Sequence, residues 1–281
     1  MPLILYVATA AILLAITHRF IRPLSRSAAM VLFLLPFAFT GVALIGNRAY
    51  GPINGPYRSE PLASLRADFG VSEKLNPVVG DIYAQMFPWR RAVQLSLQRG
   101  AWPLWNPYIL AGHLLAGNGQ TAVYSPFTLI ACLSPAATSF TFTASIAFFI
   151  AGLSSFLFAR EFGCSETASM IAAIGWMDSR IMAVYILWPF AFAWTYFPLV
   201  LLATRRIARE PNARNGALLC IVLALMLVAG YPESALHIVI LGTIYGAFDP
   251  NFMPLFARIS NCAAFQRECI IPLKSASQYD R

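Results

Sequence analysis

Long apolar runs separated by short polar connections make up most of this chain. Residues 2–17 form the first run, and a basic group closes it at His18, Arg19, Arg22 and Arg26. A second run covers residues 29–46, where Pro36 is expected to kink the backbone. A membrane-spanning helix needs about 20 mostly apolar residues. Residues 1–46 are therefore predicted to form two N-terminal transmembrane helices.

The later part of the chain repeats this pattern. Further apolar runs follow at about 137–158, 167–187, 188–204, 216–230 and 235–248. Residues 121–135 are also apolar, but they are too few to span and Pro126 interrupts them, so we expect an interfacial or re-entrant segment. The sequence predicts an all-α polytopic transmembrane helix bundle with about seven spans, of which residues 137–248 form the main part.

Arginines gather in three groups between the runs. The groups lie at 19–26, at Arg160 and at 205–214. Short cytoplasmic loops of membrane proteins carry an excess of Lys and Arg, so we place all three groups on the cytoplasmic side. The N-terminus, residues 47–136 and the Gly230–Pro232 turn then fall outside. The net charge of +8 is therefore read as a topology signal, and no nucleic-acid partner is expected.

Residues 47–136 differ in composition from the rest of the chain. They are rich in Gly, Pro, Trp, Tyr and Asn, and a structureless loop of this length is uncommon. We expect a long extracytoplasmic loop that carries short helices and a functional surface. The whole chain has 58% hydrophobic and only 11% charged residues, which suits a bilayer better than water. Residues 249–281 are predicted to be an irregular tail, as at the end of a truncated or frame-shifted product.

The first candidate site residues surround Asp81. In a helical turn, Gln85 lies four residues later on the same face, so both side chains can reach one ligand. A helix N-terminal cap is the structural alternative for Asp81. Pro88 suits the first position of a following helix. In that helix, Trp89, Val93 and Leu97 form an apolar stripe that could lie on the membrane surface.

Aromatic and amide side chains form two further clusters in the loop. Trp105 and Asn106 belong to the first, which runs on to His113, and the second contains Asn118 and Gln120. Both segments read most simply as turns. Aromatic rings also cover the C–H face of a sugar, while amide and imidazole groups bond its hydroxyls, so sugar binding is the functional alternative.

Two pairs of polar residues outside the loop are also candidates. Asp178 and Arg180 fall within an apolar run, and ionisable residues at membrane depth are functional candidates by default. They either pair inside the bundle or lie near the surface at a helix break, or Arg180 neutralises a lipid-linked phosphate. Glu233 and His237 lie one turn apart on the side of the long loop. Glu233 either reaches the same cavity or complements a helix N-terminus.

Neither a disulfide nor a metal site is predicted. The five cysteines show no C-x-x-C pair and no metal-ligand spacing. A divalent cation at Asp81 stays open, although few carboxylates lie nearby in the sequence. We therefore predict no cofactor.

Several segments together resemble the YfhO family of bacterial membrane proteins. In the loop they read GDIYAQMFPWR (80–90), LQRGAWPLWNPYILAGH (97–113) and GNGQTAVYSPF (117–127). The later WPFAFAWTYFPLVLLATRR (188–206) and AGYPESALH (229–237) look like the next spans of the same family. The resemblance covers roughly residues 75–245. The family belongs with the GT-C-type glycosyltransferases, which use polyprenyl-phosphate-linked sugars.

The resemblance implies a hexosyltransferase of the bacterial cytoplasmic (inner) membrane with an outward-facing active site. Its partners would be a lipid-linked sugar donor, a cell-envelope glycan or lipid acceptor, and the lipid bilayer. The family's acid in the first large loop, which acts as general base or orients the acceptor, corresponds most closely to Asp81. Stabilisation of the departing phosphate would fall to Arg90, Arg91 or Arg180.

Two other functions stay open. A transporter or lipid-handling protein would use the same cavity without chemistry, although the chain shows no inverted repeat. An inactive fragment of the glycosyltransferase is the other alternative. His113 stands where the turn of the family is expected to have Pro, and GT-C enzymes usually have more spans than this chain.

Single-cysteine labelling tests the predicted topology. In a background without the five native cysteines, an impermeant thiol reagent applied to intact cells should modify Glu60→Cys and His113→Cys but not Glu210→Cys. Modification of Glu210→Cys alone would invert the orientation and place Asp81 in the cytoplasm.

Overall fold

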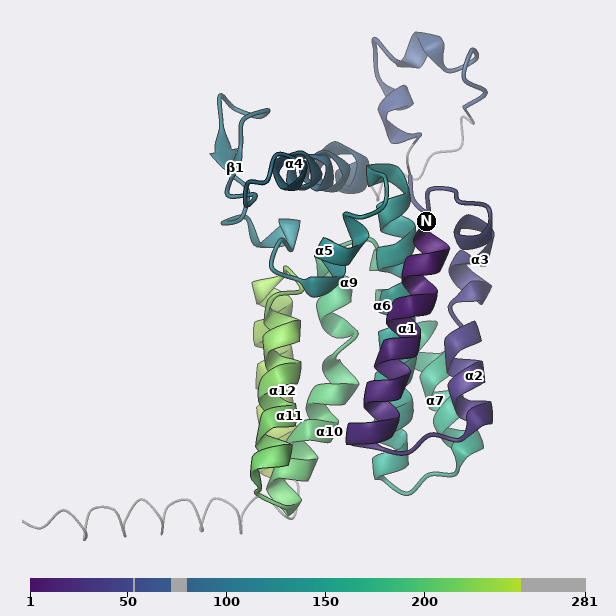
Figure 1. The fold of residues 1–281 in the computed structure, drawn as a ribbon, viewed down its shortest axis with the longest axis vertical. Coiled ribbons are helices and arrows are strands. Elements are labelled where there is room, and N and C mark those ends of the chain that lie inside the picture. Colours follow the sequence, from purple (N-terminus) through teal and green to yellow (C-terminus); the bar gives the residue numbers. More distant parts are fainter. Residues whose placement is uncertain (53, 72–79, 249–281) are drawn as a thin grey trace, which may run out of the picture.

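The computed structural model describes residues 1–52, 54–71 and 80–248. These residues are mostly α-helical, which confirms the predicted all-α class, and their strands form one short hairpin (Figure 1). The predicted tail, residues 249–281, lies outside the described residues. The N-terminal helices are α1 (Pro2–Ile16), continued by a π-helical turn (Thr17–Ile21), then α2 (Arg26–Leu34) and α3 (Phe37–Ile45).

Short elements occupy residues 47–136. They are 3₁₀ turns at Gly55–Arg58, Ala63–Leu65 and Gly119–Thr121, a π-helical turn at Ile82–Met86, the helices α4 (Phe87–Gln98) and α5 (Pro126–Ala131), and the strands β1 (Trp105–Asn106) and β2 (His113–Leu114). The two strands are antiparallel, with Trp105 opposite Leu114 and Asn106 opposite His113. In Figure 1, α4 lies across one end of the long helices.

The remaining helices run along the bundle. They are α6 (Ala136–Glu161), α7 (Glu166–Met177), α8 (Arg180–Tyr185), α9 (Pro189–Trp194), α10 (Phe197–Arg209), α11 (Ala213–Leu227) and α12 (Pro232–Phe248). Two of the predicted spans are each divided into two helices. The run 167–187 breaks at Asp178–Ser179, and the run 188–204 breaks at Thr195–Tyr196.

Two helices among the described residues are long and apolar enough to cross a membrane, Pro2–Ile21 and Ala136–Glu161. A third candidate is the pair α2 and α3, whose axes are bent by 64° where Pro36 separates them. This bend confirms the predicted kink, since proline lacks the N–H of a continuous helix. The other helices are shorter, so the count of about seven spans stays a prediction.

α6 is the central helix of the bundle. In its apolar window 78% of the residues are buried, compared with 22% in Pro2–Ile21. α1, α3, α7 and α10 all pack on it. A glycine lets α7 approach closely, because a Cβ on Gly152 would lie 2.5 Å from the Met177 sulfur. The largest fully buried side chains of α6 include Phe142, Phe148, Phe149 and Phe156.

The three arginine groups of the sequence meet at one end of the bundle. Arg22 donates to the backbone carbonyl of Arg160 (3.2 Å), and Arg206 donates to the carbonyl of Ile21 (3.1 Å). Arg206 also forms a salt bridge of 2.9 Å with Glu161, the last residue of α6. α4 lies at the opposite end (Figure 1). The groups that the sequence assigns to the cytoplasm therefore share one side of the molecule.

Candidate functional site

α4 closes one end of the bundle and carries the central residue of the candidate site. Its apolar stripe, Trp89, Val93 and Leu97, packs in one cluster with Leu115 and Val123 of the loop. Val93 is fully buried there. The sequence suggested a membrane surface for this stripe, but the stripe belongs to the loop's own core. α4 is thus held by the loop on one side and by the bundle on the other.

Arg90 lies on the side of α4 that faces the bundle, with only 7% of its surface exposed. Its Nη1 donates to the hydroxyls of Ser139 (3.3 Å) and Thr143 (3.4 Å). Its guanidinium also lies over the Phe140 ring, 4.7 Å from the centroid. Within the described residues no carboxylate forms a salt bridge with it. The first turns of α6 therefore supply every one of these contacts.

The hydroxyls of Ser139 and Thr143 can only accept from Arg90. Ser139 Oγ donates its proton to the carbonyl of Ala136 (2.7 Å), and Thr143 Oγ1 donates to the carbonyl of Ser139 (3.1 Å). Each hydroxyl has a single proton, so each hydroxyl oxygen can only accept a hydrogen bond from the guanidinium through a lone pair. Neutral oxygens solvate part of the positive charge but do not cancel it.

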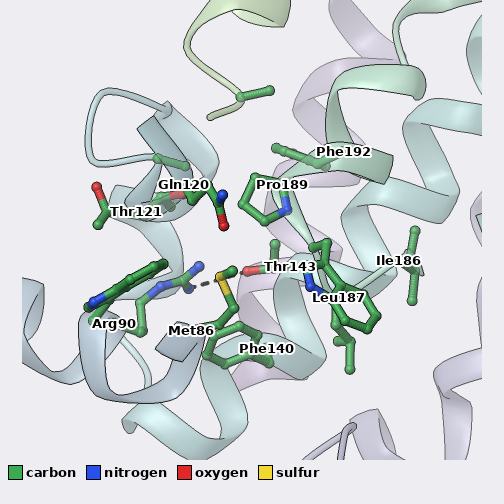
Figure 2. A pocket seen from close by; sticks show the side chains of 15 residues that line it. Met86, Arg90, Gln120, Thr121, Phe140, Thr143, Ile186, Leu187, Pro189 and Phe192 are labelled. Atoms are coloured by element: carbon green, nitrogen blue, oxygen red, sulfur yellow. Dashed lines mark hydrogen bonds between the residues drawn. The ribbon is translucent and has the colours of Figure 1, made fainter. Parts of the chain in front are cut away.

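A cavity lies beside the Arg90 guanidinium (Figure 2). About 430 Å³ of empty space lies here, including a part that is open to solvent, and about 30 Å³ of it admits the centre of a water molecule. That is room for about two waters or for one small anionic group in their place. Figure 2 shows the side chains of Arg90 and Gln120 pointing toward the same space. Thr121, Thr128 and Thr143 add hydroxyl groups to the wall.

Segments far apart in the sequence build the cavity wall. They are Met86, Trp89 and Arg90 at α4, residues 120–122 of the loop, residues 186–189 between α8 and α9, and Ala229 after α11. Gly230 permits the close approach of the α11–α12 turn to the loop. Its φ is +103°, and a Cβ there would lie 2.7 Å from the Ala122 Cβ. A side chain at this position would push the turn off the loop.

The electrostatics of the cavity follow from the burial of the Arg90 guanidinium without an acid partner. Burial lowers the pKa of Arg90, and a negative charge on the nearby Cys132 sulfur would oppose this shift more weakly. An arginine guanidinium nevertheless stays protonated in proteins. Burial also raises the pKa of the Cys132 thiol, which keeps it neutral. The wall therefore presents a positive charge to the cavity, and an anion bound there would offset the cost of burying that charge.

Three of the predicted site residues line the cavity: Trp89, Arg90 and Gln120. Asn118 supports Gln120 from outside, because its side-chain oxygen accepts from the Gln120 backbone N–H at 3.1 Å. Arg91, the neighbour of Arg90, is exposed and does not line the cavity. The helical register of α4 thus separates the two arginines that the sequence offered as alternatives.

Asp81 and Gln85 share one face, as their spacing indicates. The Gln85 amide donates to Asp81 Oδ1 at 3.4 Å. Both side chains are exposed at the turn that precedes α4, and neither lines the cavity. Asp81 makes no capping hydrogen bond to the π-helical turn that follows it. The structure does not bring Asp81 together with Arg90.

The aromatic and amide cluster at Trp105 forms the β1–β2 hairpin, away from the cavity. Asn106 accepts from the Tyr108 backbone N–H at 3.0 Å, which is the role of a turn residue. The Trp105 ring lies against Gly112, where a Cβ would come within 2.3 Å of it. Trp105 and His113 are exposed. The hairpin is thus a separate surface and contributes nothing to the cavity wall.

The candidate residues of the bundle also lie outside the cavity. Glu233 and His237 are exposed on α12. Asp178 and Arg180 are exposed at the break between α7 and α8, and they do not form the interior ion pair that was one expectation. The other expectation, a helix break at this place, is what the structure contains.

Other site residues were not singled out from the sequence. Ser139 and Thr143 are the main ones, and their spacing of four residues in an apolar helix is a signal that places two hydroxyls on one face. Phe140 and Trp188 had no distinguishing signal in a chain so rich in aromatic residues. Among the described residues, no group of three or more His, Cys, Asp or Glu is placed to hold a metal ion.

Comparisons of the chain with protein-family models, with curated proteins and with solved structures return no match. The family resemblance of the sequence therefore stays an expectation.

Arg90→Met tests whether this side chain is retained for a ligand. Methionine keeps much of the volume and removes the buried charge, so the unfolding temperature of the ligand-free protein should stay the same or rise. Arg91→Met, at the neighbouring exposed position, is the matched control. Thermal unfolding in detergent measures both. A drop of more than about 4 °C for Arg90→Met alone, roughly 1 kcal/mol or more, would make Arg90 a structural residue.

Proposed function

We propose that this chain is a multi-pass membrane protein that binds a phosphate-bearing lipid and transfers a sugar from it to a cell-envelope acceptor. The donor is a polyprenyl-phosphate-linked sugar, and the acceptor is a glycan or lipid. The reaction takes place at the α4 end, on the extracytoplasmic face of the bacterial cytoplasmic membrane. The observation that carries this proposal is the buried, acid-free charge of Arg90 beside a cavity.

Composition and the arrangement of charge support the membrane location. The mean hydropathy is +0.64, and only 11% of the residues are charged. We retain about seven spans, with α7–α8 and α9–α10 each crossing as a broken helix. The end of the bundle where Arg22, Arg160 and Arg206 meet, here called the arginine end, lies in the cytoplasm by the positive-inside rule. Residues 47–136 then carry α4 and its cavity to the outer surface.

An apolar crevice next to the cavity supports a lipid as the ligand. It lies between α1, α6, α10 and α11, and about 210 Å³ of it admits the centre of a water molecule. Phe192 lines the cavity and packs edge-on against Phe127 (5.7 Å between centroids) and Tyr196 (6.0 Å), which both line the crevice. The cationic space and the apolar one therefore adjoin at one group of aromatic rings. An anionic head group joined to a hydrocarbon chain would occupy the two spaces in this order as it passes those rings.

In the proposed reaction, Arg90 stabilises the phosphate as it departs. The acceptor hydroxyl oxygen forms a bond to the anomeric carbon of the sugar, and the bond from that carbon to the phosphate oxygen breaks. The phosphate keeps the electron pair and leaves on the lipid. A preorganised guanidinium is most effective where this negative charge develops. The cavity is too small for a sugar ring, so the sugar lies at its mouth.

Asp81 is the general base that the family resemblance suggests for this reaction. It would take the proton of the acceptor hydroxyl, which must come within about 2.6–3.2 Å of the carboxylate. Asp81 is exposed and hydrogen-bonded to Gln85, a position that an acceptor arriving from the envelope can reach. The acceptor would then bind between Asp81 and the mouth of the cavity.

A lipid-handling protein without catalysis is the second candidate. The position of Asp81 outside the cavity wall favours it, because the phosphate site is complete without any acid. Such a protein would bind the same lipid through Arg90 and would leave the sugar on it. The two candidates therefore differ in sugar transfer and agree in lipid binding.

Binding of a polyprenyl phosphate to the purified protein in detergent tests the shared part of the proposal. Arg90→Gln should weaken binding about tenfold or more, because hydrogen bonds to a charged partner are lost. Arg91→Gln should stay within about twofold of the parent protein, a difference well below that of one such bond. Equal binding by the parent protein and Arg90→Gln would contradict the proposed site.

Sugar transfer from a lipid-linked donor separates the two candidates. Asp81→Asn should abolish transfer and leave polyprenyl phosphate binding intact, because the amide cannot accept the proton. Asp68→Asn, another exposed acid of the loop, is the control and should retain activity. Normal transfer by Asp81→Asn would remove Asp81 from the mechanism. Parent protein that binds the lipid and transfers nothing would establish the lipid-handling alternative.

A further inference from the structure

Two opposite charges flank the break between α7 and α8. Asp178 is the C-cap residue that follows α7, Arg180 is the first residue of α8, and Ser179 lies between them. Both side chains are exposed, and in the described parts of the chain neither forms a salt bridge. Residues two positions apart do not face each other along a helix. The two charges therefore do not neutralise each other within one chain.

The break lies near the middle of the bundle's height. α7 starts at the arginine end and has 12 residues, a rise of about 18 Å. α6 runs the full height with 26 residues, a rise of about 39 Å. If the bundle spans a bilayer as proposed above, Asp178 and Arg180 lie at the depth of the hydrocarbon. The inference that follows rests on that part of the proposed function and is independent of Arg90.

Exposed charges at this depth require a polar partner. Ionisable residues in membrane helices are costly and almost always face the bundle interior or pair with one another. Here both are exposed, and the face of α7 that precedes Asp178 is otherwise suited to helix packing. Ile171 is 67% exposed on it, and a Cβ on Gly175 would meet nothing within 4 Å. Small residues at such positions let two membrane helices approach closely.

We propose that this face of α7 and α8 binds a second copy of the chain around a two-fold axis. In a two-fold interface residue i contacts j of the partner while j contacts i. Asp178 of each copy then pairs with Arg180 of the other, and both charges of both copies are neutralised. The axis stands along the membrane normal, because both copies insert in the same orientation.

The spacing of the two residues fits this arrangement. Two helical positions correspond to a rise of about 3 Å, so Asp178 and Arg180 of facing copies lie at nearly the same depth. Gly175, one turn before Asp178, keeps the two helices close enough for the side chains to meet. A partner of another kind would need its own acid and its own base at this depth, whereas a second copy carries both.

Charge exchange measures the pairing directly. The protein is placed in lipid vesicles, and its monomer–dimer equilibrium is followed by single-molecule photobleaching. Asp178→Arg and Arg180→Asp, made separately, each create like-charge contacts and should weaken dimerisation about tenfold or more, in the range of intramembrane polar contacts. The double variant Asp178→Arg/Arg180→Asp restores both pairs and should return to within about threefold of the parent protein, since the two contacts are re-formed.

A cross-linking measurement keeps the proposal testable if the exchanged variants fail to fold. In a background without native cysteines, Gly175→Cys should form a disulfide between two copies, because the same residue of each copy lies near the axis. Ile12→Cys, which is 59% exposed on α1, is the matched control and should not cross-link. The loss of the disulfide in Asp178→Arg carrying Gly175→Cys would link the contact to the charge pair.

The outcomes separate this inference from the proposed function. A chain that resists carbonate extraction from vesicles but is monomeric, with Gly175→Cys unlinked, overturns the dimer and leaves the membrane location intact. If Gly175→Cys is not cross-linked but is protected from a lipid-soluble maleimide, something other than a second copy covers this face of α7. That result overturns the inference as well. A chain released by carbonate overturns both.

Discussion

The packing of α6 is the constraint on which the other elements depend. Its side chains are buried along almost the whole helix, so neighbours on every side are fitted to it. Its last residue, Glu161, holds Arg206 and so joins the arginine end of the bundle. Its first turns offer Ser139 and Thr143 to Arg90 and so hold α4 at the opposite end. A shift of α6 by one residue would rotate its side chains by about 100° and would break both connections at once.

This arrangement buries Arg90 at a cost to the stability of the fold. A buried guanidinium is usually matched by a carboxylate, because the loss of hydration is otherwise uncompensated. Here two hydroxyls and an aromatic face supply partial solvation, and the rest of the charge is turned toward a cavity. The charge that would attract a phosphate is therefore also one that costs the fold stability. The apolar crevice behind Phe192 would take the hydrocarbon chain of the proposed lipid.

Much of the fold could be predicted from local pattern, and most of the site could not. The helical class, the kink at Pro36 and the shared face of Asp81 and Gln85 all follow from spacing within a few residues. The break at Thr195 was missed, and the break at Asp178 was only one of the expectations for that run, since hydropathy does not report where a helix is interrupted. The cavity was beyond reach because its wall combines the start of α6, the loop at Gln120 and the turn before Gly230. Such contacts depend on tertiary packing. Arg90 was a candidate from the sequence, but only the register of α4 distinguishes it from Arg91.

The most direct measurement is the affinity of the protein for a polyprenyl phosphate compared with the uncharged polyprenol of the same chain length. Both ligands offer the same hydrocarbon to the crevice, and they differ only in the group that Arg90 would hold. A site built around a buried cation should bind the phosphate at least about tenfold more tightly, as expected for hydrogen bonds to a charged partner. Equal affinity for the two lipids would show that the charge of Arg90 serves some other purpose and would contradict the proposed phosphate site.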